Sequence, residues 1–200
     1  MRFCRSAVLL LLAVAALLPV PLAADILTFE GFSDSTSLTS QYPGLTFQSA
    51  TVITAGISLN EFEFPPHSGI NVVFDDGGPI SILFASPIIG FSGYFTYGLP
   101  LTLNAFDSGS NQVGQALSLF SSNLALSGDT GSSPNEFLSL SFAAGISSVT
   151  ITGDPAGGSF VLDDATFTPV PEPNSLVLLL TMATTIAVPA WKRAHNHQST

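Results

Sequence analysis

Between residues 25 and 168 the sequence contains no lysine and no arginine. All four basic residues, Arg2, Arg5, Lys192 and Arg193, lie outside this stretch, whereas thirteen of the fourteen Asp and Glu residues lie inside it. Proteins that bind nucleic acid place cationic side chains against phosphate groups. The absence of such side chains excludes nucleic acid as a partner of this stretch, and it excludes an anionic membrane surface for the same reason.

The same stretch lacks cysteine, tryptophan and methionine, and its one histidine is His67. Without cysteine no disulfide can stabilise the fold, although an oxidising compartment would permit one. A zinc site needs several His or Cys ligands, and a Ser-His-Asp relay would depend on His67 alone. The segment Gly90-Phe-Ser-Gly does not have the Gly-x-Ser-x-Gly spacing of a nucleophile elbow. These absences argue against an enzyme.

A pair of carboxylates is the remaining hint of catalysis. Glu61 and Glu63 are two residues apart, and alternation along a strand would place both on one face. Glycosidases also use two carboxylates, but these flank the scissile bond. We therefore interpret the pair as a solvated edge and keep a secreted hydrolase of matrix polysaccharide as the alternative function.

The stretch does contain the pattern of β-structure. Short alternating runs recur between turns rich in Gly, Pro, Asn and Asp, and no segment has helical periodicity. Fifteen of the sixteen Phe residues lie here and supply much of a core. The length suits one domain, and the pattern predicts an all-β fold, a single antiparallel β-sandwich. The predicted strands are 26–29, 45–48, 70–74, 80–84, 101–106, 112–120, 137–142, 149–152 and 160–162, with 107–111 as a hairpin loop.

Residues 1–24 have the organisation of a secretory signal peptide. Arg2 and Arg5 form a short basic region, residues 7–18 are apolar without interruption, and small residues follow at Ala23 and Ala24. We expect cleavage after Ala23 or Ala24, and an uncleaved N-terminal anchor is the alternative. Export would leave residues 25–168 as the mature domain.

Residues 169–200 form a C-terminal tail with three parts. Pro171-Glu172-Pro173 comes first, and its prolines prevent a helix from continuing into the domain. The apolar run 175–191 would make a helix of about 25 Å, at the short end of what spans a bilayer. Lys192 and Arg193 then suit the cytoplasmic side. The tail is predicted to be a transmembrane helix, with a buried core helix as the alternative.

This order of parts resembles the PEP-CTERM sorting signal of Gram-negative bacteria. The resemblance rests on Pro171-Glu172-Pro173, the hydrophobic helix and the basic pair Lys192-Arg193 behind a signal peptide. It implies recognition by an exosortase, a membrane-embedded transpeptidase-like enzyme, and removal of the tail. It also implies export through the inner membrane, anchoring by the C-terminal helix before processing, and then a place at the cell surface or in an extracellular matrix of exopolysaccharide or biofilm.

The two ends of the domain resemble jelly-roll carbohydrate-binding modules. The residues that carry this resemblance are Phe29-Glu30 in the first strand and the run from Leu162 to Phe167 in the last. In that group the terminal strands lie close together, often around a structural calcium ion. The resemblance implies a jelly-roll-like sandwich with Glu30, Asp163 and Asp164 as candidate Ca²⁺ ligands. The domain also resembles uncharacterised β-sandwich proteins that commonly precede this type of tail.

The acidic pair on the last strand gives the calcium hypothesis a physical basis of its own. Neighbouring residues of a strand point to opposite faces, so we expect one of Asp163 and Asp164 to be buried. A buried carboxylate must be paired, hydrogen-bonded or neutralised, and the domain has no Lys or Arg to pair with it. Three solutions stay open, which are backbone amide donors, protonation, or Ca²⁺ with its preference for oxygen ligands.

One aromatic residue is a candidate for ligand binding. In the run from Phe91 to Tyr97, alternation places Phe91, Phe95 and Tyr97 on one face and Tyr94 on the other. If the Phe face is inward, Tyr94 can stack on a sugar ring, and the alternative is that it packs beneath a loop. The sequence therefore favours a non-catalytic surface or matrix protein with glycan recognition at this face.

Overall fold

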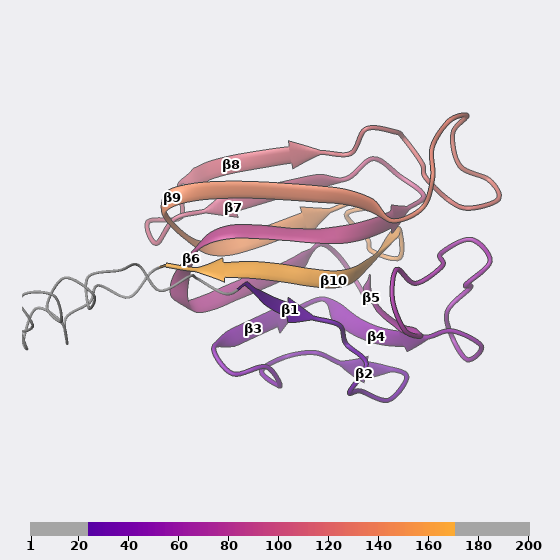
Figure 1. Cartoon of the computed structure of the whole chain (residues 1–200), viewed down its shortest axis with the longest axis horizontal. Coiled ribbons are helices and arrows are strands. Elements are labelled where there is room, and N and C mark those ends of the chain that lie inside the picture. The colour runs from indigo at the N-terminus through magenta and orange to yellow at the C-terminus, as the bar shows by residue number, and fades with distance from the viewer. Residues whose placement is uncertain (1–23, 171–200) are drawn as a thin grey trace, which may run out of the picture. The chain divides into compact units, whose positions relative to one another are not determined.

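A computed structural model describes residues 24–170 of the chain. These residues contain ten strands and no helix, so the all-β prediction is confirmed and no described helix is available to cross a membrane. Every pairing between the strands is antiparallel (Figure 1). In chain order the strands are β1 (Asp25–Leu27), β2 (Thr36–Ser37), β3 (Leu45–Gln48), β4 (Ala50–Thr54), β5 (Asn71–Asp75), β6 (Ile80–Tyr97), β7 (Thr102–Phe106), β8 (Gln112–Leu117), β9 (Glu136–Thr152) and β10 (Phe160–Pro169).

All ten strands belong to one continuous sheet that folds over into two layers. The pairing order is β2-β4-β5-β10-β6-β9-β7-β8, with β1 added to β10 and β3 added to β6. The first layer contains β1, β2, β4, β5 and β10, together with residues 90–97 of β6 and 136–141 of β9. The second layer contains β3, β7 and β8, together with residues 80–83 of β6 and 148–152 of β9. The two long strands therefore belong to both layers.

The crossover between the layers lies where Pro87 of β6 approaches Gly145 of β9. The register of the two strands is interrupted on both sides of Pro87, and a residue without an N–H fits a stretch that has no ladder partner. Gly145 has a φ of 109°, and a Cβ there would lie 3.1 Å from the Cβ of Pro87. Beyond the crossover, the buried positions of β6 change from even numbers, such as Ile82, to odd numbers, such as Phe91.

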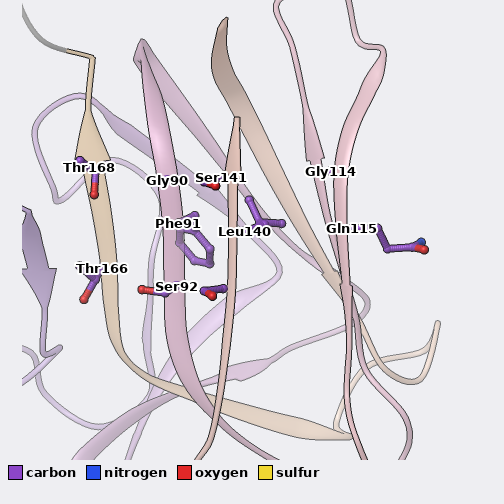
Figure 2. A pocket seen from close by; sticks show the side chains of 10 residues that line it. Gly90, Phe91, Ser92, Gly114, Gln115, Leu140, Ser141, Thr166 and Thr168 are labelled. Atoms are coloured by element: carbon purple, nitrogen blue, oxygen red, sulfur yellow. The ribbon is translucent and has the colours of Figure 1, made fainter. Parts of the chain in front are cut away.

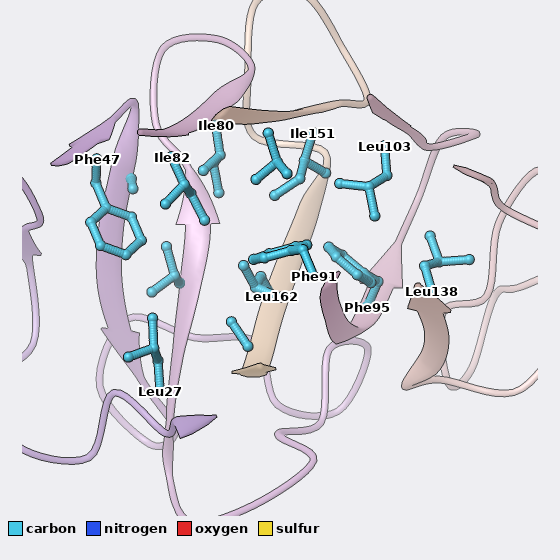
Figure 3. Close-up of a cluster of buried hydrophobic side chains, with 14 of the residues drawn as sticks. Leu27, Phe47, Ile80, Ile82, Phe91, Phe95, Leu103, Leu138, Ile151 and Leu162 are labelled. Atoms are coloured by element: carbon cyan, nitrogen blue, oxygen red, sulfur yellow. The ribbon is translucent and has the colours of Figure 1, made fainter. Parts of the chain in front are cut away.

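The inner faces of the two layers enclose one large hydrophobic cluster. Phe95 and Tyr97 of the first layer, and Ile80 and Leu103 of the second, have no exposed surface. Complete burial of such a side chain stabilises the folded state by about 1.5–3 kcal/mol, so this cluster supplies the main drive for folding. Figure 3 shows Phe47, Ile80, Ile82, Leu103 and Ile151 of the second layer facing Leu27, Phe91, Phe95, Leu138 and Leu162 of the first.

The structure has a strand at each predicted run, but β6 and β10 are much longer than predicted, the runs 137–142 and 149–152 belong to one strand, and β2 and β4 were not predicted. The hairpin loop 107–111 joins β7 to β8, and the terminal strands pair, with Asp25 opposite Phe167. Glu61 and Glu63, however, lie in turns between β4 and β5 and not on a strand. The jelly-roll likeness itself stays a prediction.

The compact unit that contains these strands runs from Ala23 to Val170, two residues beyond each end of the predicted domain 25–168. Residues 1–23 of the predicted signal peptide lie outside the described residues. The sorting motif Pro171-Glu172-Pro173, the helix predicted at 175–191 and the basic pair Lys192-Arg193 also lie outside them.

Candidate functional site

The outer face of the first layer carries small hydroxyl side chains where β10, β6 and β9 pair with one another. Apolar residues of these strands, such as Phe91 and Leu138, are buried in the core, so alternation turns the Ser and Thr residues between them outward. The strand registers arrange these positions in two rows, Thr166-Ser92-Ser139 and Thr168-Gly90-Ser141, read from β10 across β6 to β9.

The two rows line a shallow hollow of about 450 Å³. Figure 2 shows Thr166 and Thr168 on one side of it and β8 on the other, where the side chain of Gln115 points away from the other lining residues. Gly90 has no side chain, which leaves the middle of the second row open. No side chain that lines the hollow is charged. We call the outward residues Ser92, Ser139, Ser141, Thr166 and Thr168 the hydroxyl face.

Three aromatic rings adjoin the hydroxyl face, two of them on the next row of the sheet. Tyr94 lies opposite Phe137 of β9 and opposite Asp163 of β10. The Tyr94 ring stacks on the imidazole of His67, with centroids 3.5 Å apart and planes at 9°, and its centroid lies 5.2 Å from that of Phe137. His67 therefore covers one face of Tyr94, whereas Phe137 has 54% of its surface exposed.

The two adjacent carboxylates of β10 hold the segment that places His67 on Tyr94. The backbone N–H groups of His67 and Ser68 donate to Oδ2 of Asp163 at 2.7 and 2.8 Å. Nδ1 of His67 lies 2.7 Å from Oδ2 of Asp164, and Oγ of Ser68 donates to Oδ1 of Asp164 at 2.9 Å. Asp164 has a φ of 45° at a break in the register of β10 with β6, so both carboxylates reach the same segment. We call His67 and Ser68 the strap.

Asp163 is buried beneath the strap and not between the layers. It is 1% exposed, and its Oδ1 also accepts the N–H of Asp164 at 2.7 Å. Burial, together with the neighbouring Asp164 carboxylate, raises the pKa of Asp163 to about 6 against the opposing effect of the Ser68 amide. From the sequence, amide donors, protonation and Ca²⁺ were the three possible ways to stabilise a buried carboxylate. The structure shows the amide donors, and the raised pKa of Asp163 adds partial protonation near pH 6.

Glu30 occupies a different place from the other two candidate calcium ligands. Its Oε1 accepts the N–H groups of Ile70 and Asn71 at 3.0 and 2.9 Å, at the start of β5. Among residues 24–170, no three His, Cys, Asp or Glu side chains form a group that could hold a metal ion. The structure thus does not bring Glu30 together with Asp163 and Asp164 as one ligand set, and calcium binding stays a prediction.

Glu63 and His67, two of the candidate catalytic residues, have other partners. One carboxylate oxygen of Glu63 accepts the N–H groups of Leu126 and Ser127 at 3.0 and 3.2 Å, and the Leu126 amide lowers the pKa of Glu63. Oγ of Ser68 bonds to Asp164, so His67 and Ser68 share that carboxylate and do not form a relay from Ser to His to Asp. These contacts give Glu63, Ser68 and His67 positioning roles within the fold.

Phe137 and the hydroxyl face were missed by the sequence prediction. Their strands were predicted, but the hydroxyl face depends on the register between β10, β6 and β9, which are far apart in the chain. One signal in the sequence could have identified them. Leu138 and Leu140 alternate with Phe137, Ser139 and Ser141, which places an aromatic residue and two serines on the outward face of one strand.

No protein family and no curated protein matches this sequence. The fold is similar to the K2 cleaved adhesin domain of Lys-gingipain, with a TM-score of 0.48 and 16% identity over 73% of this chain and 99% of that chain. A DUF4465 family protein from Bacteroides caccae has a TM-score of 0.45 and 10% identity over 74% and 99% of the two chains. A family 29 carbohydrate-binding module complexed with mannohexaose has a TM-score of 0.41 and 9% identity over 76% and 94%. Likenesses at this level assign neither a family nor a ligand to this chain.

Proposed function

We propose that this protein is a non-catalytic protein of the cell surface or extracellular matrix whose domain binds neutral polysaccharide at the hydroxyl face. The observation that carries the proposal is an uncharged, hydroxyl-lined hollow of about 450 Å³ beside the exposed ring of Phe137. Each hydroxyl group both donates and accepts hydrogen bonds, as do the hydroxyl groups of a sugar. An exposed aromatic ring offers an apolar face for the C–H face of a sugar ring.

The charge of the domain favours a neutral ligand over an anionic one. Residues 24–170 contain thirteen Asp and Glu side chains and no Lys or Arg, so an acidic polysaccharide would meet repulsion that no local cation offsets. A neutral glycan avoids this penalty. The ligand class that fits is therefore an uncharged polysaccharide, such as an exopolysaccharide without uronic acid or sulfate groups.

Affinity electrophoresis in gels that contain mannan, dextran or alginate tests this proposal. We expect retardation by at least one neutral polymer and none by alginate. Phe137→Ala should weaken binding about tenfold or more, because loss of a stacked aromatic face removes about 1.5 kcal/mol or more of binding free energy. Ser139→Asp should weaken it as well, since it places a charge in the hollow.

Phe62→Ala is the matched control, because Phe62 is also an exposed phenylalanine, at 71%, and does not line the hollow. Its binding should equal that of the wild type. Tyr94→Ala tests the covered ring of the same aromatic group. Retardation that is unaffected by both Phe137→Ala and Ser139→Asp would show that the glycan binds elsewhere.

The route to the surface is a second part of the proposal, and it is supported by the sequence of the two ends. We propose that an exosortase-type enzyme recognises Pro171-Glu172-Pro173 and removes the membrane-anchoring tail after export. Replacement of all three residues by alanine should leave the protein in the inner-membrane fraction at its uncleaved mass. Release of this variant at the same rate and mass as the wild type would contradict the assignment.

A further inference from the structure

The strands of the second layer contain no charged side chain. Strands β3, β7 and β8, with residues 80–83 of β6 and 148–152 of β9, have no Asp, Glu, Lys, Arg or His. The thirteen carboxylates of residues 24–170 lie instead on strands of the first layer or in loops. Two copies of so acidic a molecule repel one another wherever carboxylates would meet. The second layer is therefore the part of the described domain that a second copy can approach without that repulsion.

A row of uncharged polar residues crosses this layer on its outer face. The registers place Gln48, Ser81, Thr150, Asn104 and Gln115 opposite one another in that order, one from each strand. Oγ of Ser81 and Oγ1 of Thr150 are 3.4 Å apart, and Nε2 of Gln115 donates to Oδ1 of Asn104 at 3.0 Å. The row ends with an exposed glutamine at each margin of the layer, Gln48 on β3 and Gln115 on β8.

The two edge strands of this layer, β3 and β8, differ in whether their outward backbone N–H and C=O groups already have hydrogen-bond partners. On β3, the N–H of Phe47 donates to the carbonyl of Thr39 at 2.7 Å, so the segment before β3 covers part of that edge. β8 pairs with β7 on one side, and within residues 24–170 no strand pairs with its other side. β8 also has no proline and no charge, the devices that commonly protect an edge strand from pairing.

We propose that two copies of this chain pair antiparallel through β8, with Gln115 of one copy opposite the partner's Gln115. A twofold axis at this residue makes the contact self-complementary and closed. It joins the two second layers into one sheet and continues the polar row across the interface. The outward N–H and C=O groups of β8 then gain partners, and no strand that comes together carries a carboxylate.

Two acidic groups that hold the segments on either side of β8 are engaged within their own copy. Oδ1 of Asp107, in the β7–β8 turn, accepts the N–H groups of Gly109 and Asn111 at 2.8 and 2.9 Å. Oε1 of Glu136 accepts the N–H of Leu119, which follows β8, at 2.9 Å. Neither carboxylate lies on the strand that forms the proposed contact.

Cysteine cross-linking of the full chain tests the register. Cys4→Ser removes the only thiol, and Gln115→Cys or Gln48→Cys then adds one at either end of the same row. Opposed residues of an antiparallel pair have Cα atoms about 4.5–5.5 Å apart, within the range of a disulfide. We expect oxidation to give disulfide-linked dimers from Gln115→Cys and not from Gln48→Cys. No dimer from Gln115→Cys, or equal yields from both variants, would overturn the proposed pairing.

Sedimentation of the full chain in a nonionic detergent tests the association itself. Gln115→Glu sets two like charges opposite each other and should weaken dimerisation about tenfold or more, whereas Gln48→Glu should dimerise like the wild type. Mixing Gln115→Glu with Gln115→Lys should restore a mixed dimer. A monomeric wild type, or association that Gln115→Glu and Gln48→Glu weaken equally, would refute β8 as the interface, and loss of folding would be seen by circular dichroism.

Discussion

At the scale of single residues, Asp163 links the candidate site to the stability of the fold. Its carboxylate accepts three backbone N–H groups, from His67, Ser68 and Asp164, and it is almost completely buried. Burial in a domain without Lys or Arg disfavours the ionised form more than these donors favour it. The raised pKa of Asp163, about 6, is the result.

The contribution of Asp163 to the stability of the domain should therefore fall as the pH rises from about 4 to about 6. The ordinary pKa of an Asp is 3.8 and that of folded Asp163 is about 6, so in this window the folded state binds more protons than the unfolded state. The effect is at most about 3 kcal/mol, and the pKa of Asp75, also raised by burial, adds to it in the same direction. Urea denaturation at a series of pH values measures this slope.

Asp163→Asn should remove the Asp163 part of that slope. Asp107→Asn is the matched control, because hydrogen bonds from Asn111 lower the pKa of Asp107, and its loss should leave the fall between pH 4 and 6 in place. If Asp163→Asn kept the full slope, the proton would reside on another group.

At the scale of elements, the turn between β9 and β10 packs against the turn between β5 and β6. Gly157 has a φ of 86°, and a Cβ there would lie 2.5 Å from the carbonyl oxygen of Asp75 and 2.6 Å from the nitrogen of Gly78. The N–H of Gly158 donates to the Asp75 carbonyl at 2.7 Å, and Asp75 in turn accepts the N–H of Ser159 at 2.9 Å. This contact fixes where β10 enters the first layer.

Gly157→Ala should destabilise the domain by about 3 kcal/mol or more, because it combines a left-handed φ with a backbone clash. Gly158→Ala is the control, since Gly158 also has a positive φ, 76°, but no atom within 4 Å of its Cβ position. That variant should cost only about 1 kcal/mol. Chemical denaturation of both variants measures the difference, and equal losses would show that the clash is relieved by movement of the turn.

The strands and hairpins of this fold were only partly predictable from the sequence. Alternation and turn residues predicted most of the strands and the β7–β8 hairpin, because these are local signals. The sequence did not show that the runs 80–84 and 91–97 form one strand, because Pro87 between them predicts a strand end. Nor did it show that the runs 137–142 and 149–152 form one strand. β4 was missed because a single residue, Ser49, separates it from β3. The contact between the strap and Asp163 could not be predicted, because the two lie nearly one hundred positions apart in the sequence.

At the scale of the whole molecule, the charge is almost entirely of one sign. Within residues 24–170 the only salt bridge joins His67 to Asp164, and it exists only while the histidine is protonated. The remaining carboxylates have hydrogen-bond donors or solvent but no cation of the domain. Net repulsion of this kind destabilises a compact state and is weakened by salt.

Sodium chloride should accordingly raise the melting temperature of the domain as its concentration increases from about 0.01 to about 0.5 M, where the screening length falls from about 30 Å to a few Å. Calcium chloride at equal ionic strength is the control for specific cation binding. An equal rise would assign the effect to screening, whereas a much larger rise with calcium, reversed by a chelator, would support a Ca²⁺ site at Asp163 and Asp164 or at Glu30. A melting temperature that falls with added sodium chloride would contradict the repulsion.

The crossover of β6 and β9 also determines how this domain can come apart. Since each of these strands is shared by both layers, neither layer can detach and leave the other with an intact hydrogen-bonded ladder. Opening without global unfolding is then confined to the margins, where β1, β2, β3 and β8 each pair with one strand. A chain exposed to proteases outside the cell would gain from such cooperativity, because few partially open states would offer an internal peptide bond for cleavage.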